Sequence, residues 1–336
     1  MTHPSSANPQ PHSDARLVAL GAWLAQALGP DVGAPAPASA DASFRRYFRV
    51  RWQGASYVVM DAPPDKEDCA PFIKVAALLQ AAGLHAPQIL AQDLRQGFLL
   101  LSDLGTQTYL QGFTPENTEP LMQAAIGALI KWQQASAPAM LPPYDAALLQ
   151  RELDLFPDWY VQRHLRRELS AAQREDWRLT CERLLASALA QPRVYVHRDY
   201  MPRNLMISDP APGVLDFQDA VYGPISYDIA SLLKDAFLSW PAERVERWRR
   251  VYWEQARAAQ LPLASDYAAF CHEFDLMALQ RHLKVLGIFA RINYRDGKPH
   301  YLADTPRFIR YVREVLPGYG ELAPLVRLFD QLDLRA

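Results

Sequence analysis

The chain has 336 residues, of which 50% are apolar and 21% charged, and its net charge is −2. This composition is typical of a soluble globular protein, and the length suits two domains or one bilobal enzyme. Because no basic stripe accompanies the near-neutral charge, the sequence excludes nucleic acid as a partner. No apolar run approaches the about 18 residues of a membrane span.

The remaining whole-chain features predict a cytoplasmic protein. The three cysteines are far apart and form no CxxC pair, which argues against a disulfide framework or a zinc site and fits a reducing compartment. The first residues do not resemble a signal peptide. No feature of the sequence indicates a membrane or an obligate protein partner.

The first third of the chain combines strand and helix patterns. Residues 1–13 are polar and rich in Pro and Ser, which predicts a disordered start. Asp14–Leu28 has the periodicity of an amphipathic helix. Pro35 and Pro37 allow at best an edge strand over 34–40. Later elements are predicted at Arg45–Trp52 and Ser56–Asp61 (strands joined by a turn at Gln53-Gly54), Phe72–Ala82 (helix) and Phe98–Leu101 (strand).

From Thr118 onward the pattern is helical, apart from one β-like stretch at 193–217. Helices are predicted over 118–135, 145–167, 171–190, 226–238, 241–259, 266–290 and 304–315. Together the patterns predict an α+β fold of two lobes. The smaller, β-rich N-lobe covers 14–105 with a hinge near 102–105, and the larger, mainly helical C-lobe covers 106–336.

The segment from His197 to Asn204 reads HRDYMPRN and is followed, twelve residues later, by Asp216-Phe217. A carboxylate at Asp199 can accept the proton of a hydroxyl that attacks a phosphoryl group, which makes it the candidate catalytic base. Asn204 and Asp216 offer the hard oxygen ligands that Mg²⁺ prefers. Two short strands around 205–207 and 214–215 would hold these residues on one hairpin. The alternative is a surface turn and a strand-end cap, which the three matched spacings disfavour.

This arrangement resembles the aminoglycoside phosphotransferase/choline kinase-like family, relatives of the protein kinases, over about residues 14–315. The resemblance implies a bilobal protein-kinase-like fold with ATP and Mg²⁺ as cofactors. It assigns structural roles to His197 and to Asp228, which would bond the catalytic-loop backbone. In the family, a glycine-rich loop and the hinge bind the nucleotide; in this chain every glycine of the loop is replaced. The nucleotide-binding positions that the resemblance implies in these two segments are Ala42, Ser43, Phe44, Arg45, Tyr47, Leu101, Ser102 and Leu104. Taken alone, these segments also fit a hairpin end and a buried edge strand.

One departure from the family concerns the lysine that grips the nucleotide phosphates. Its place at the end of Tyr57-Val58-Val59 is taken by Met60. We therefore expect another cation to meet the phosphates. The candidates are Arg45, Arg46, Lys66 and Lys74.

Several stretches are similar to one branch of the family, the anomeric N-acetylmuramate/N-acetylglucosamine 1-kinases of bacterial cell-wall recycling. They include Asp41–Val50, Val59–Pro64, Glu152–Tyr160 and Asp216–Ala220. This likeness implies phosphorylation of the anomeric hydroxyl of N-acetylmuramate, N-acetylglucosamine or both to the sugar 1-phosphate. The sugar-binding candidates mix carboxylates, amides, an aromatic ring and a cation for the lactyl carboxylate: Glu152, Asp154, Asp158, Trp159, Gln218, Asp219 and Arg295. An amphipathic helix with solvated acids, and a plain basic loop around Arg295, are the alternatives.

Other acceptors are compatible with the same catalytic loop. A choline or ethanolamine kinase would need an aromatic cage for the ammonium group, and an aminoglycoside kinase would need a strongly acidic acceptor site. A protein kinase is excluded, because only twelve residues separate Asp216 from Asp228. A non-catalytic nucleotide-binding scaffold is the alternative outside the enzymes.

Overall fold

The computed structural model describes residues 15–39 and 44–335. The chain divides into two compact units, the first reaching Ala76 and including Pro87–Leu104, the second formed by Ala77–Ala86 and the chain from Gly105 onward. The expected disordered start, and the nucleotide-binding candidates Ala42 and Ser43, lie outside the described residues.

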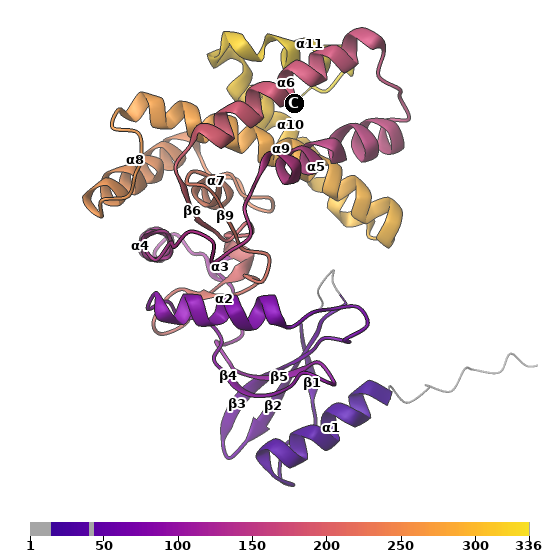
Figure 1. The fold of residues 1–336 in the computed structure, drawn as a ribbon, viewed down its shortest axis with the longest axis vertical. Coiled ribbons are helices and arrows are strands. Elements are labelled where there is room, and N and C mark those ends of the chain that lie inside the picture. The colour runs from indigo at the N-terminus through magenta and orange to yellow at the C-terminus, as the bar shows by residue number, and fades with distance from the viewer. Residues whose placement is uncertain (1–14, 40–43, 336) are drawn as a thin grey trace, which may run out of the picture. The chain divides into compact units, whose positions relative to one another are not determined.

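The first unit contains a five-stranded antiparallel sheet in the order β1-β2-β3-β5-β4 (Figure 1). Its elements are α1 (Ala15–Leu28), β1 (Ala36–Ser39), β2 (Arg46–Trp52), β3 (Ala55–Asp61), the start of α2 (Ala70–Ala81), β4 (Ile89–Asp93) and β5 (Phe98–Ser102). The Pro-containing β1 is an edge strand, as predicted. Strand β4 was not predicted, because an edge strand with alternating partly buried and exposed residues carries little apolar signal.

The β2–β3 register separates two neighbouring side chains of β3 onto opposite faces of the sheet. Tyr47 lies opposite Met60, and Arg46 lies opposite Asp61. On the Asp61 face, α1 packs against the sheet and the buried Asp61 carboxylate accepts hydrogen bonds from Arg16 and Arg46. The position of the expected lysine is therefore occupied by a fully buried Met60, and the next residue is a buried carboxylate held by two arginines.

The second unit is mainly helical (Figure 1). Its helices are α3 (Tyr109–Gly112), α4 (Thr118–Gln134), α5 (Ala146–Leu155), a π-helix (Phe156–His164), α6 (Ala171–Ala190), α7 (Tyr227–Leu233), α8 (Ala242–Ala258), α9 (Tyr267–Asp296), α10 (Thr305–Val315) and α11 (Ala323–Gln331), besides short 3₁₀ turns. Two small antiparallel pairs carry the β-like stretch, β6 (Arg193–Val196) with β9 (Val221–Pro224) and β7 (Leu205–Met206) with β8 (Gly213–Val214).

Three predicted helices differ from the structure at their ends. The predicted helix 145–167 is α5 followed directly by the π-helix, whose second residue is Pro157. The predicted helix 226–238 ends at Leu233, because the Asp235 carboxylate accepts the N–H groups of residues 237 and 238 and so forms a turn. Helix α9 continues to Asp296 and ends at Gly297, which has a φ of 67°.

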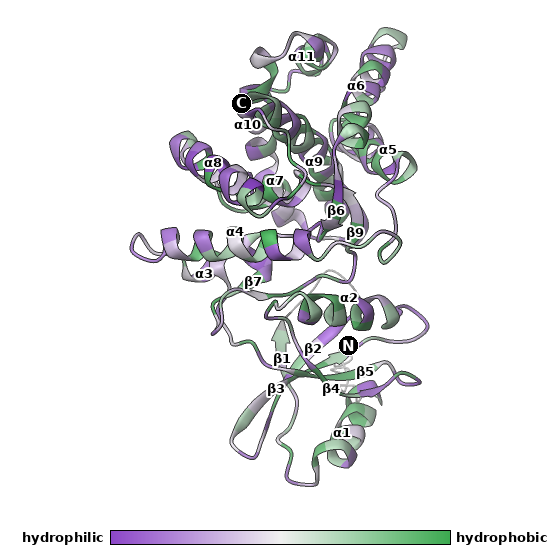
Figure 2. Ribbon diagram, turned by 60° about the vertical axis from the view of Figure 1, so that its left-hand side comes forward, coloured by the Kyte–Doolittle hydropathy of each residue, from purple (hydrophilic) through white to green (hydrophobic). Residues whose placement is uncertain are grey.

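Helix α9 is the centre of the second unit and packs against α5, the π-helix, α6, α7 and α10. It approaches α5 very closely at Gly287, where a Cβ atom would lie 2.3 Å from the carbonyl carbon of Leu155. Helix α8 carries both hydrophilic and hydrophobic residues (Figure 2), and its buried residues recur at helical spacing, as expected for an amphipathic helix. Of the helices in the described parts of the chain, none has the length and apolar character needed to cross a membrane.

The close approach at Gly287 predicts a large loss of stability on adding one methyl group there. We expect Gly287→Ala to lower the free energy of unfolding by about 2–3 kcal/mol, because backbone atoms of Leu155 must move. Gly127 in α4 is the matched control, since nothing lies within 4 Å of its added Cβ. Gly127→Ala should stabilise the protein by about 1 kcal/mol through helix propensity. Urea denaturation measures both, and equal effects would contradict the packing argument.

Candidate active site

The β7–β8 hairpin and the turn before it bring the parts of the predicted catalytic motif together within the second unit. Asn204 closes a 3₁₀ turn directly before β7, and Asp216 follows β8 by two residues. Asn204 Nδ2 donates to the backbone oxygen of Asp199 (2.9 Å) and lies 3.2 Å from Asp216 Oδ2. One amide side chain thus links the candidate base segment to the candidate metal ligand.

The backbone at this site adopts left-handed conformations at two residues that are not glycine. Arg198 has a φ of 75° and Asp216 a φ of 61°. Such conformations cost about 1–3 kcal/mol each and persist only where the surroundings hold them. The fully buried Asp228 carboxylate accepts the N–H groups of His197 and Arg198 (3.0 Å to the latter), which fixes the first of these turns. Burial raises the pKa of Asp228 to about 7, although both N–H donors favour its ionised form.

His197 is buried and acts as an uncharged link in the loop. Burial lowers its pKa to about 4. Its Nε2 atom lies 3.0 Å from the carbonyl oxygen of Leu215, and its Nδ1 atom accepts the N–H of Asp199 at 3.3 Å. This pattern corresponds to a neutral ring with its proton on Nε2. His197 therefore ties the segment that carries Asp199 to the segment that carries Asp216.

The donor chemistry of the hairpin fits a hard divalent cation. Asp216 provides a carboxylate, and Asn204 Oδ1 accepts no hydrogen bond from the described residues, because the amide nitrogen makes the contacts. Few protein ligands combined with phosphate oxygens are characteristic of Mg²⁺ sites. Among residues 15–39 and 44–335, no cluster of three or more His, Cys, Asp or Glu side chains is arranged for a metal ion.

Glu152 lies in a buried ion network next to the catalytic loop. Arg198 Nη2 donates to Glu152 Oε1 at 2.6 Å, and Lys284 Nζ lies 2.8 Å from the same oxygen. The other oxygen accepts from Tyr144 and, at 3.2 Å, from Gln280. Although burial alone would raise the pKa of Glu152, Lys284 and Arg198 outweigh burial and hold it at about 2.

The other sugar-binding candidates lie at or near the surface of the second unit. Asp158, Asp219 and Arg295 are exposed, and Asp154, Trp159 and Gln218 are partly buried. Gln218 Nε2 donates to Asp216 Oδ1 at 2.8 Å, and the Asp219 carbonyl accepts a long hydrogen bond from Arg198. Trp159 packs against the helical core, Asp154 accepts from Gln150, and Arg295 pairs with its neighbour Asp296. Gln218 and Asp219 thus lie beside the catalytic loop.

The described nucleotide-binding candidates all belong to the first unit. Phe44 is 65% exposed, Arg45 pairs with Glu67 at 2.9 Å, and Tyr47 is part of β2. Leu101 and Ser102 end β5, where Ser102 Oγ accepts the N–H of Gln88. Leu104 is buried, and the following Gly105 has a φ of 103°.

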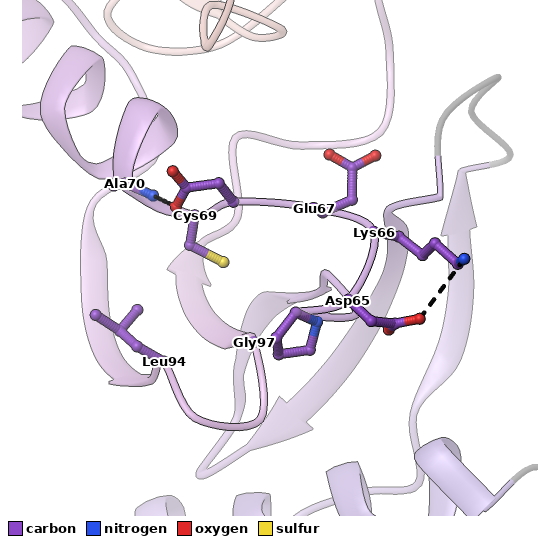
Figure 3. Close-up of a pocket in the computed structure, with 9 residues that line it drawn as sticks. Asp65, Lys66, Glu67, Cys69, Ala70, Leu94 and Gly97 are labelled. Atoms are coloured by element: carbon purple, nitrogen blue, oxygen red, sulfur yellow. Dashed lines mark hydrogen bonds and ion pairs between the residues drawn. The ribbon is translucent and has the colours of Figure 1, made fainter.

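A pocket of about 450 Å³ lies within the first unit between β3 and α2 (Figure 3). It is lined by Pro64, Asp65, Lys66, Glu67, Asp68, Cys69, Ala70, Leu94 and Gly97. Three of these side chains are acidic and only Lys66 is basic, and its amine pairs with Asp65 at 3.7 Å. This lining does not suit the phosphates of a nucleotide, because the carboxylates would repel them.

The sequence analysis did not identify Lys284, Gln280 or Tyr144 as neighbours of the catalytic loop. Lys284 carried a usable signal, because it interrupts the apolar run from Leu283 to Leu286 in a helix. A lysine within a buried helix face is nearly always paired. Its partner, 132 positions away along the chain, could not be read from the sequence.

Structural comparison supports the expected fold class. Choline kinase LicA from Streptococcus pneumoniae superposes with a TM-score of 0.61 at 12% identity, covering 90% of this chain and 99% of its own. The aminoglycoside phosphotransferase APH(2'')-Ib with ADP bound superposes with a TM-score of 0.59 at 15% identity, with the same coverage of both chains. The predicted α+β, protein-kinase-like fold is therefore confirmed.

Sequence comparison gives the family. Residues 35–269 match the phosphotransferase enzyme family. The N-acetylmuramate/N-acetylglucosamine kinase of Pseudomonas putida is 54% identical over 97% of this chain and 99% of its own length. The kinase of the same name from Pseudomonas aeruginosa is 55% identical over 95% of this chain and 97% of its own length. The chain therefore belongs to the phosphotransferase enzyme family.

Proposed function

We propose that this protein is a kinase that uses ATP to phosphorylate the anomeric hydroxyl of N-acetylmuramate and N-acetylglucosamine. The observation that carries the proposal is that Asn204, at the start of the β7–β8 hairpin, bonds both the Asp199 backbone and the Asp216 carboxylate, in a chain more than half identical to kinases named for these two sugars. The ADP-bound neighbour in fold supports ATP as the phosphoryl donor. The sugar 1-phosphate product would feed the recycling of peptidoglycan precursors.

In this proposal Asp199 accepts the proton of the attacking sugar hydroxyl. An anomeric hydroxyl is more acidic than an ordinary alcohol, so a carboxylate is a sufficient base. Asn204 and Asp216 would hold Mg²⁺, which when bound neutralises charge on the transferring phosphoryl group. His197 and Asp228 fix the loop, since they bond its backbone and its neighbouring strand. Gln218 and Asp219 are positioned beside the loop to meet sugar hydroxyls.

Two further features complete the proposal. Arg45 is the proposed substitute for the missing phosphate-binding lysine, because Arg46 is bonded to the fully buried Asp61 on the α1 face, whereas the partner of Arg45 is the partly exposed Glu67. The cytoplasm is the proposed site of action, because it supplies ATP and keeps thiols reduced, and the chain's cysteines are free.

The roles of the carboxylates predict different defects. Asp199→Asn should leave nucleotide binding nearly intact and lower turnover about 10²–10⁴-fold, the usual contribution of general base catalysis. Asp216→Asn should instead abolish Mg²⁺-dependent nucleotide binding, because it removes the charged ligand. Turnover assays and calorimetric titration with ATP and Mg²⁺ measure the two effects. Near wild-type turnover of Asp199→Asn would show that the base is assigned wrongly.

The substitute cation predicts a nucleotide-specific defect. Arg45→Ala should raise the KM for ATP and lower turnover, with kcat/KM reduced about 10–100-fold, as expected for a charge-assisted hydrogen bond of about 1.5–3 kcal/mol. Lys66→Ala is the control, since Lys66 lies one residue before the Arg45 partner Glu67 and is about half exposed. A larger effect of Lys66→Ala on the KM for ATP would transfer the role to that lysine.

The acceptor hydroxyl is tested with blocked sugars. A methyl glycoside at C1 should abolish phosphorylation, while a 6-deoxy sugar should lose only the hydrogen bonds of its missing hydroxyl, about 1 kcal/mol each. In ³¹P NMR the product phosphorus should couple to the anomeric proton. A 6-phosphate product, or phosphorylation of choline but of no sugar, would refute the proposed acceptor and leave a phosphotransferase of another specificity.

A further inference from the structure

The network around Glu152 places a carboxylate where direct contact with a substrate is difficult. Glu152 is 5% exposed, and four protein groups donate to or pair with its two oxygens. A carboxylate has about four acceptor sites, so these partners leave little capacity for a sugar hydroxyl. The function of Glu152 therefore depends on the protein groups that it binds.

Glu152 is the anion that the two cations of the network share. Glu152 Oε1 lies 2.6 Å from Arg198 Nη2 and 2.8 Å from Lys284 Nζ. A buried charge that has lost its partner is strongly unfavourable. Loss of the Glu152 charge would therefore leave Arg198 and Lys284 close together without the carboxylate that both contact.

Two glycines allow this network to form. Gly287 lets α9 approach α5 one turn from Lys284 and Glu152, respectively, since a Cβ there would meet the backbone of Leu155. Gly223 in β9 similarly makes room for Tyr144, whose Cβ would lie 2.5 Å from an added Cβ. The hydroxyl of Tyr144 donates to Glu152. The contacts of Glu152 therefore come from α9, from the segment directly before α5 and from the catalytic loop.

The network around Glu152 binds Arg198, where the backbone of the catalytic loop is strained. Arg198 has a φ of 75°, which is unfavourable for a residue that has a side chain. Asp228 holds the N–H groups of His197 and Arg198, while Glu152 holds the guanidinium of Arg198 from α5. Asp199 directly follows this turn. The direction of the chain at Asp199 therefore depends on both Asp228 and Glu152.

We propose that Glu152, itself paired with Lys284, is a positioning residue for phosphoryl transfer, which binds the Arg198 guanidinium and so maintains the left-handed turn that directs the Asp199 carboxylate. The proposal rests on the proposed function, because it takes Asp199 as the catalytic base. It assigns to Glu152 an effect on turnover rather than on sugar binding.

The first test is a steady-state comparison of Glu152→Gln with wild type. We expect kcat to fall about 10–100-fold, the scale of a small misplacement of a catalytic group, while the KM values for ATP and sugar change less than about threefold. Arg151→Gln removes a charge from the exposed neighbouring position on α5 and should leave kcat unchanged. An increase in the sugar KM with unchanged kcat would mean that Glu152 contacts the sugar, and would overturn the proposal.

A second pair of variants leaves the buried Glu152–Lys284 pair intact, in case Glu152→Gln fails to fold. Glycine adopts a φ of about 75° without strain, whereas alanine does not. If the guanidinium works through the backbone, Arg198→Gly should retain a kcat several-fold higher than Arg198→Ala, with similar KM values. Equal kcat in the two variants, or an equal rise of the sugar KM in both, would refute the positioning role.

The activity of the wild-type protein distinguishes a failure of the positioning role from a failure of the proposed function. If wild type phosphorylates no amino sugar, the proposed acceptor is wrong, and the same kcat comparisons are made with whichever acceptor is phosphorylated, choline or an aminoglycoside. If wild type phosphorylates the sugars but Glu152→Gln matches it in kcat, the positioning role alone is wrong. Circular dichroism spectra of all variants verify that they are folded.

Discussion

The backbone turn at Arg198 is the constraint on which the candidate active site depends. A left-handed conformation at a residue with a side chain is unfavourable by itself, and this one is held by the two N–H groups that the buried Asp228 accepts. Because the turn directs the chain from β6 toward the hairpin, it determines where Asp199 lies relative to Asn204. A second left-handed residue, Asp216, lies on the other side of the same hairpin.

Two helices of the second unit provide the charged side chains that support the catalytic loop. Helix α9 contributes Lys284 and α5 contributes Glu152, and the absence of a side chain at Gly287 brings the two helices within reach. The same long helix forms much of the apolar core with the π-helix and α10. Packing of the core and placement of the charged network are therefore consequences of one helix, which explains why a methyl group at Gly287 should disturb both.

In the first unit, charge placement follows from the pairing of β2 with β3. The register places Arg46 and Asp61 on the face that α1 covers, and Tyr47 with Met60 on the other. The replacement of a lysine by Met60 is thus accompanied by a buried carboxylate that binds Arg16 and Arg46. This arrangement narrows the choice of a phosphate-binding cation, because Arg46 already has a structural partner.

The class of this protein could be predicted from its sequence, because the features that define the class are local. The spacing of Asp199, Asn204 and Asp216 within twenty residues, and the periodicity of the long helices, need no knowledge of distant contacts. Helix ends were predicted less well where a side chain such as Asp235 turned the chain. The place of Glu152 could not be predicted, because its partners Arg198 and Lys284 lie 46 and 132 positions away and meet it only in the folded chain. A carboxylate that pattern alone offered as a sugar ligand became, through those long-range contacts, part of the buried support of the catalytic loop.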